Sequence, residues 1–243
     1  MKFQHLLLAL SFLTRLPVPD LGKLEAPDFG RAALFYPLVG LVIGGLLCVP
    51  WLVFPHASPL LLAAILTVLW AAITGGLHLD GLADSADAWL GGFGDEEKTH
   101  RILKDPLVGA AGVIALVGVL LLKFAALSVL IAHQQWLVIV FAPLLGRILI
   151  LLLFLTTPYV RAGGLASEVT QHLPRQTAGW ITAAGLLLGL AISTAGILLM
   201  LLGFWLLRRL MLQRLQGCTG DTAGASVESG EMLWLTGAAL ILT

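Results

Sequence analysis

Four long apolar runs constrain the fold of this chain more than any other feature of its sequence. Each has close to the ~20 residues that an α-helix needs to cross a lipid bilayer. They occupy residues 33–54, 59–79, 108–132 and 136–157. The chain is 58% hydrophobic and only 12% charged, whereas about 25% of the residues of a soluble domain are charged. We therefore predict an all-α, polytopic transmembrane helix bundle of about six to seven helices or half-helices, with residues 1–243 as a single domain.

The distribution of basic residues predicts the orientation of the bundle. Two short connections, residues 55–58 and 133–135, join the apolar runs into hairpins and contain no Lys or Arg. The basic residues lie on the other side: Lys2, Arg15, Lys23, Arg31, Lys98, Arg101, Lys104, Arg161 and Arg175. By the positive-inside rule, the N-terminus and the loops 80–107 and 158–179 face the cytoplasm. The formal net charge is zero, which gives no reason to expect a nucleic acid partner.

The apolar stretch 180–207 has two interpretations. As one span it would place Arg208, Arg209 and Arg214 outside the cell. As two short helices, broken at a hinge near residues 193–196, it returns these arginines to the cytoplasm. We favour the hairpin, because charge and topology then agree.

The two ends of the chain predict only short helices. The final apolar run, residues 232–243, crosses half of the membrane, or extends across it if Glu228 and Glu231 lie at its mouth. The N-terminal run, residues 6–13, is also too short to span and lacks the small-residue cleavage site of a signal peptide. We expect this segment to lie in the membrane interface or to dip into it.

An acidic cluster follows the second apolar run. Asp80, Asp84 and Asp87 are spaced i, i+4 and i+7, so a helix would place them on one face. Like charges this close repel one another, and a cluster of oxygen ligands suits a hard cation, Mg²⁺ above all. His78 precedes the cluster. It could position a phosphate or help a hydroxyl to lose its proton, and it could equally hydrogen-bond within the bundle.

Several cations are candidates for binding an anion. Arg101 and Lys104 lie one helical turn apart and could grip phosphate oxygens, although a plain charged loop would also contain them. Arg147 lies inside a predicted span, where it needs an anionic partner, either a substrate or one of the aspartates. Lys123 is also mid-span, but no motif surrounds it, so we interpret it as structural or cavity-facing.

A second polar segment, residues 217–224, is rich in glycine. Its backbone N–H groups, that of Gly220 among them, could surround phosphate oxygens. A plain glycine turn before a helix is the alternative. Asp221 and Glu228 are spaced i and i+7, so this segment could add a pair of carboxylates to the metal site.

Four of these segments resemble the signatures of the cobalamin synthase family, the adenosylcobinamide-GDP ribazoletransferases. They are TGGLHLDGLADSAD at 74–87, FLTRLPVP at 12–19, RILKD at 101–105 and GCTGDTAGA at 217–225. The resemblance extends from about residue 3 to the C-terminus, and the motifs follow in the family's order.

The resemblance implies a multi-pass enzyme of the bacterial or archaeal inner membrane, in contact with membrane lipid, with its active site facing the cytoplasm. Such an enzyme joins adenosylcobinamide-GDP to α-ribazole, or to α-ribazole 5′-phosphate. The products are adenosylcobalamin, or its 5′-phosphate, and GMP, and the reaction requires Mg²⁺.

In residue terms, the resemblance implies one or two Mg²⁺ ions held by carboxylates from two motifs: Asp80, Asp84, Asp87 and Asp221. It implies contacts with the phosphates and the substrate from Arg101, Lys104, Arg147 and Gly220. The catalytic proton acceptor would be an aspartate, Asp80 or Asp84, or else His78.

Two other classes of protein are weighed against this one. CDP-alcohol phosphotransferases of lipid synthesis share an aspartate-rich pattern, but Leu77 and Asp84 stand where that pattern needs Asp and Arg. A cation transporter would need carboxylates near the bilayer midplane, whereas the mid-span ionisable residues here are Lys123 and Arg147. Substrate-dependent GMP release separates the three. The sequence leaves open whether the chain forms a homo-oligomer and whether other enzymes of the cobalamin pathway bind it.

Overall fold

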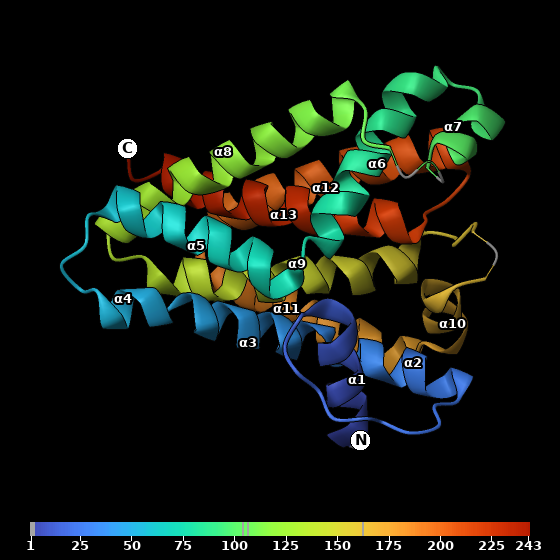
Figure 1. Ribbon diagram of the computed structural model, residues 1–243, viewed down its shortest axis with the longest axis horizontal. Coiled ribbons are helices and arrows are strands. Elements are labelled where there is room, and N and C mark those ends of the chain that lie inside the picture. Colours follow the sequence, from blue (N-terminus) through green and yellow to red (C-terminus); the bar gives the residue numbers. More distant parts are fainter. Residues whose placement is uncertain (1–2, 104, 106, 162) are drawn as a thin grey trace.

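Long helices lie side by side along the long axis of the molecule (Figure 1). The computed structural model describes residues 3–103, 105, 107–161 and 163–243, and within these ranges the chain forms helices and no strand. Four segments are long and apolar enough to cross a membrane: Tyr36–Val53 (α3, Tyr36–Leu47, with α4, Val49–Val53), α8 (Ala110–Ala132), α9 (Trp136–Thr156) and α12 (Thr194–Leu215). The other helices are α1 (Phe3–Leu13), α2 (Ala26–Ala33), α5 (Pro59–Thr74), α6 (Leu77–Gly92), α7 (Glu96–Ile102), α10 (Leu165–His172), α11 (Arg175–Ile192) and α13 (Gly220–Leu240). The predicted all-α membrane bundle is confirmed.

The second predicted span ends earlier than expected. It breaks after α5 at Gly75 and Gly76, and α6 leaves at 90° to α5. Both glycines have a left-handed backbone conformation, with φ of 63° and 72°. This conformation ends helices, and residues with a side chain rarely adopt it. The prediction of one span over 59–79 was therefore wrong at its C-terminal end. The turn carries the acidic cluster on α6 across the bundle, against α8 and α13.

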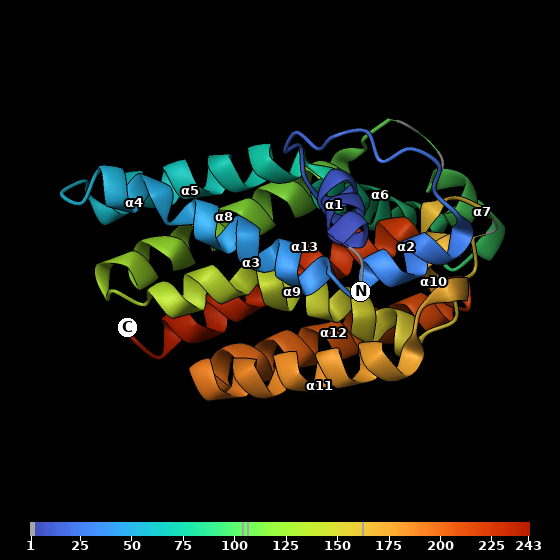
Figure 2. The ribbon, with the colours of Figure 1, turned by 90° about the horizontal axis from the view of Figure 1, so that it is seen from below.

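The predicted hairpin within the arginine-flanked apolar stretch is confirmed, with longer helices than expected. The chain breaks at Ser193, and α11 and α12 lie side by side (Figure 2). Arg175, at the start of α11, donates to the carbonyl oxygen of Leu155 at 2.6 Å. Arg208, near the end of α12, donates to the hydroxyl of Thr157 at 3.0 Å. Both ends of the hairpin therefore meet the C-terminal end of α9.

The C-terminal helix differs most from its prediction. Instead of a short helix over 232–243, α13 is a 21-residue helix packed against α6, α8, α9 and α12. Glu228 and Glu231 do not lie at a membrane mouth, because their side chains are 4% and 0% exposed inside the bundle. Trp234 is also fully buried, and its indole Nε1 donates to the carbonyl oxygen of Val138 at 2.8 Å. The helix is the central element of the bundle.

Candidate active site

A cavity of about 170 Å³ lies where α6 and α13 begin. One part of its wall is polar and is formed by His78, Asp80, Asp221 and the backbone of Gly220. The rest is mostly apolar and comes from Phe12, Leu13, Tyr36, Leu77, Ile150, Phe154, Ala166, Val169 and Ala223. The cavity can therefore accept a ligand with one charged and one apolar part.

Two aspartates from distant motifs meet at this cavity because two helices cross closely. Asp80 lies in the first turn of α6 and Asp221 in the first turn of α13. A Cβ on Gly81 would lie 2.6 Å from the carbonyl oxygen of Asp221, so this crossing requires glycine. Thr219 caps α13 by accepting a hydrogen bond from the backbone N–H of Thr222 at 3.3 Å. Both carboxylates lie at helix N-termini, where the helix dipole favours negative charge.

The carboxylates of this region repel one another. The pKa of the Asp84 carboxyl, which lies outside the four spans, is raised to about 6, and burial is the largest cause. The negative charges of Asp80, Asp221 and Asp87 act in the same direction. Burial also raises the pKa of Asp221, and the positive charge of Arg161 opposes that shift.

Carboxylate oxygens under mutual repulsion are suitable ligands for Mg²⁺. The described side chains do not, however, include three His, Cys, Asp or Glu already drawn together as a metal cluster. The oxygen donors of Asp80, Asp84 and Asp221 are of the type that Mg²⁺ prefers, and the Mg²⁺ site stays a prediction.

Asp87 has a different environment from the other aspartates of its motif. Its Oδ2 accepts a hydrogen bond from the N–H of Gly109 at 2.7 Å, and its Oδ1 accepts one from the N–H of Gly112 at 2.9 Å. These N–H groups belong to the start of α8, which would otherwise leave them without partners. The geometry therefore favours a helix-capping role for Asp87 over its predicted role as a metal ligand.

Arg147 does not line the cavity but lies behind it. Its side chain is fully buried, and its Nη1 pairs with Glu231 and donates to the carbonyl oxygen of Pro143 at 3.2 Å. Its Nη2 lies 3.4 Å from Nδ1 of His78, which does line the cavity. The predicted alternatives for its anionic partner were a substrate or an aspartate, and the partner in the structure is Glu231. Arg147 reaches the cavity only through His78.

Lys123 completes this buried group of charges. Its Nζ lies 2.6 Å from a carboxylate oxygen of Glu228 and 2.6 Å from one of Glu231, and 4.4 Å from the ring centre of Trp70. The structural interpretation of Lys123 therefore agrees with its contacts. The predicted carboxylate pair of Asp221 and Glu228 is wrong, because Glu228 is engaged by Lys123 in the core.

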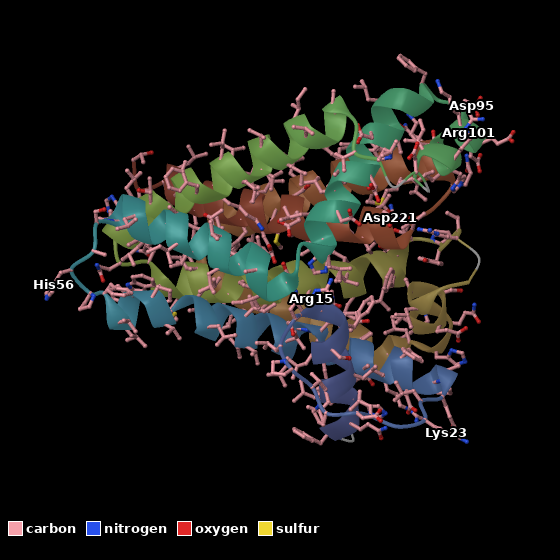
Figure 3. The ribbon with its side chains drawn as sticks, in the orientation of Figure 1. Arg15, Lys23, His56, Asp95, Arg101 and Asp221 are labelled. Atoms are coloured by element: carbon pink, nitrogen blue, oxygen red, sulfur yellow. The ribbon has the colours of Figure 1, made fainter. Side chains whose placement is uncertain are left out.

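Of the cations that the sequence singled out, Arg147 contacts the cavity wall through His78, and Arg101 lies away from the cavity. Arg101 is exposed on α7, and Figure 3 places it beside Asp95 at the outer end of the molecule. Lys104 lies outside the described residues. Instead, Arg161 donates to a carboxylate oxygen of Asp221 at 2.9 Å. The only sequence signal for Arg161 was its place among the cytoplasmic basic residues.

Arg15, in the motif at 12–19, lies beside the glycine turn that ends α5. Its guanidinium lies against Gly75, where an added Cβ would meet it. Its backbone N–H donates to the carbonyl oxygen of Ile73 at 2.8 Å. Figure 3 shows Arg15 near the junction of α5 and α6. The sequence shows that Arg15 belongs to a family motif, but it does not show that Arg15 contacts Gly75.

The apolar helices and the acidic cavity beside Arg161 are those of a polytopic membrane protein with a candidate active site. Comparison with known proteins gives the particular family. The family model described as cobalamin-5-phosphate synthase matches residues 5–239, so this chain belongs to that family and is a transferase. The resemblance carried by the four sequence motifs is confirmed.

Curated relatives match the chain over nearly its whole length. The adenosylcobinamide-GDP ribazoletransferase of Pseudomonas putida (strain W619) is 52% identical over 237 residues, which are 96% of this chain and 97% of the relative. The protein of the same name from Acinetobacter baumannii (strain ATCC 17978) is 51% identical over 229 residues, 92% of each chain. That of Stutzerimonas stutzeri (strain A1501) is 52% identical over 239 residues, 97% of each chain. No solved structure matches the chain.

Proposed function

We propose that this protein transfers the adenosylcobinamide phosphate group of adenosylcobinamide-GDP to α-ribazole, or to α-ribazole 5′-phosphate, and releases GMP. The observation that carries the proposal is the meeting of Asp80 and Asp221, from two separate family motifs, at the polar end of one cavity. Relatives that share half of the residues over nearly the full length bear the name of this activity. The apolar part of the cavity suits the aromatic base of α-ribazole.

In the proposed reaction, a hydroxyl oxygen of α-ribazole forms a bond to the phosphorus that carries the cobinamide. The bond from this phosphorus to the oxygen that bridges to GMP breaks, and GMP leaves with that electron pair. The hydroxyl proton passes to a base on the enzyme. Asp80 and Asp84 are the carboxylate candidates, since Asp80 lines the cavity and Asp84 follows it one helical turn later.

Binding of the diphosphate would use groups at both helix starts. Arg161, whose side chain is 41% exposed, would contact a phosphate oxygen with the part of its guanidinium that does not bind Asp221. The N–H of Gly220 lies at the N-terminus of α13, where helices favour anions. Asp80, Asp84 and Asp221 would hold Mg²⁺. When bound, Mg²⁺ neutralises charge on the diphosphate and on the departing phosphate.

We further propose that the enzyme lies in the bacterial inner membrane with this cavity facing the cytoplasm. The basis is the positive-inside rule. The basic residues Lys23 and Arg101 lie towards one end of the molecule, and His56, in a connection without Lys or Arg, lies at the opposite end (Figure 3). Large apolar side chains on the outer faces of the long helices, among them Ile114, Trp180 and Leu198, are exposed and would contact lipid.

The proposal is tested by GMP release from the detergent-purified protein, given adenosylcobinamide-GDP and α-ribazole 5′-phosphate, with Mg²⁺ or with EDTA. We expect GMP only when both substrates and the metal are present. Asp80→Asn should abolish release while the protein stays folded. Glu96→Gln is the matched control, because Glu96 is an exposed carboxylate on α7 away from the cavity. Equal activity of the two variants, or no GMP from folded wild-type protein, would contradict the proposal.

A further inference from the structure

A chain of buried polar groups runs from the core of the bundle to the wall of the cavity. Lys123 on α8 binds Glu231 on α13, Glu231 binds Arg147 on α9, and Arg147 contacts His78 on α6. Each of these four side chains is at most 4% exposed. Buried charges are costly to maintain and mark functional candidates in membrane proteins.

The contact with Arg147 determines which ring nitrogen of His78 carries the proton. The guanidinium has only N–H donors and does not lose its proton in proteins. Its Nη2 faces Nδ1 of His78 at 3.4 Å, so Nδ1 must offer a lone pair. A proton on Nδ1 would place an N–H group against an N–H group. The neutral imidazole therefore carries its proton on Nε2.

The Nε2–H group is the one left for a ligand. His78 lines the cavity together with Asp80 and Asp221. Throughout the described ranges, no protein atom forms a hydrogen bond with Nε2 of His78, while Nδ1 is used by Arg147. A nitrogen that already carries a proton cannot remove one from a hydroxyl, but it can donate a hydrogen bond to an oxygen.

The orientation of Arg147 is itself fixed by its surroundings. The guanidinium is a rigid fork, with one arm on Glu231 and the other on His78. Glu231 is held in turn, because Lys123 binds its second oxygen at 2.6 Å. A Cβ on Gly146 would lie 2.8 Å from Glu231, so glycine leaves the space in which the carboxylate sits.

We propose that Glu231 and Arg147 are positioning residues that hold His78 as a hydrogen-bond donor to a phosphate oxygen of the substrate. This inference rests on the proposed function. It assigns His78 to the stabilisation of charge on the phosphate during transfer, and the hydroxyl proton goes to a carboxylate. Preorganised donors of this kind in a site shielded from water are a large source of catalytic power.

The first test replaces the imidazole by groups that keep or remove the donor. In His78→Gln the amide N–H group takes the place of Nε2–H, whereas His78→Ala offers no donor. We expect His78→Gln to keep kcat within about tenfold of wild type and His78→Ala to lose about 10²-fold or more. His5→Gln is the matched control, since His5 is also buried and binds a carboxylate, that of Asp28 at 3.0 Å, but does not line the cavity. Equal loss in His78→Gln and His78→Ala, with His5→Gln active, would overturn the inference, because an amide cannot replace a base.

The second test asks whether Arg147 acts through His78. The ammonium of Arg147→Lys cannot bind Glu231 and His78 with two arms of a fork, so kcat should fall while KM stays near its wild-type value. In a His78→Ala background the same change should have little further effect on kcat. Equal losses in both backgrounds would show that Arg147 serves the fold alone and would refute its positioning role.

A third readout does not depend on turnover. The ¹⁵N chemical shifts of labelled histidine, with His78 assigned by difference from His78→Gln, distinguish a protonated ring nitrogen from an unprotonated one. We expect Nε2 of His78 to be protonated and Nδ1 to be unprotonated, and the opposite tautomer would overturn the proposal. If wild-type protein released no GMP and yet showed the expected tautomer, the proposed function alone would have failed.

Discussion

The crossing of α6 and α13 at Gly81 gives the sharpest test of how this fold builds its cavity. In Gly81→Ala the new Cβ would lie 2.6 Å from the carbonyl oxygen of Asp221, whereas ordinary contact begins at 3.4 Å. The two helix backbones must therefore separate by about 0.8 Å. Overpacking of this kind costs about 1–3 kcal/mol, and a displacement of about 1 Å at a catalytic site can cost about 10²-fold in rate.

The measurement compares thermal unfolding and GMP release in Gly81→Ala and Gly45→Ala. Gly45 lies in the last turn of α3 with no atom within 4 Å of an added Cβ, so the same substitution meets open space there. Gly45→Ala should keep full activity and should not lose stability, because alanine is the better helix former. Gly81→Ala should lose stability and about 10–100-fold of its kcat. If the two variants behaved alike, the close crossing would not be what holds Asp80 and Asp221 together.

Three further predictions concern the capping aspartate, the rim arginine and the orientation. Asp87→Ala should lower the free energy of unfolding by about 0.5–2 kcal/mol, as loss of a helix cap does. It should leave the Mg²⁺ concentration for half-maximal GMP release unchanged, and a large rise in that concentration would indicate that Asp87 is a metal ligand. Arg161→Gln should raise KM for adenosylcobinamide-GDP about tenfold, as loss of a charged hydrogen bond does. Circular dichroism checks that the variant is folded, and an unaltered KM in the folded variant would contradict the prediction. In intact cells, a membrane-impermeant maleimide should label His56→Cys and not Arg101→Cys. Labelling of Arg101→Cys alone would show that the protein has the opposite orientation in the membrane.

The spans were predictable from the sequence because hydropathy is a local property, and their exact ends were not. The left-handed turn at Gly75 and Gly76 ends α5 within an apolar run, where hydropathy shows no change. The true length of α13 was hidden for the opposite reason. Glu228 and Glu231 lower its apolar character, and the Lys123 that neutralises them lies more than a hundred residues away in the chain.

In the candidate site, too, the features set by neighbouring residues were predictable and those set by distant residues were not. The spacing of Asp80 and Asp84 places both on one helix, and the structure confirms that helix. The convergence of Asp221 with them depends on helix packing at one glycine, which spacing along the chain cannot show. The capping partners of Asp87 lie 22 and 25 residues further on, so its difference from its neighbours was not visible in the motif.

The buried charges also have a consequence for the biogenesis of the protein. Two carboxylates in the middle of a helix make its transfer into lipid costly. The cations that neutralise Glu228 and Glu231 are on α8 and α9, which are synthesised earlier. Since α13 is not among the helices apolar enough to cross a membrane, we expect it to join the bundle by docking between helices that are already in place. Because α13 also brings Asp221, the cavity is assembled only when this last helix arrives, and a nascent chain that stops before Gly220 has no active site to expose.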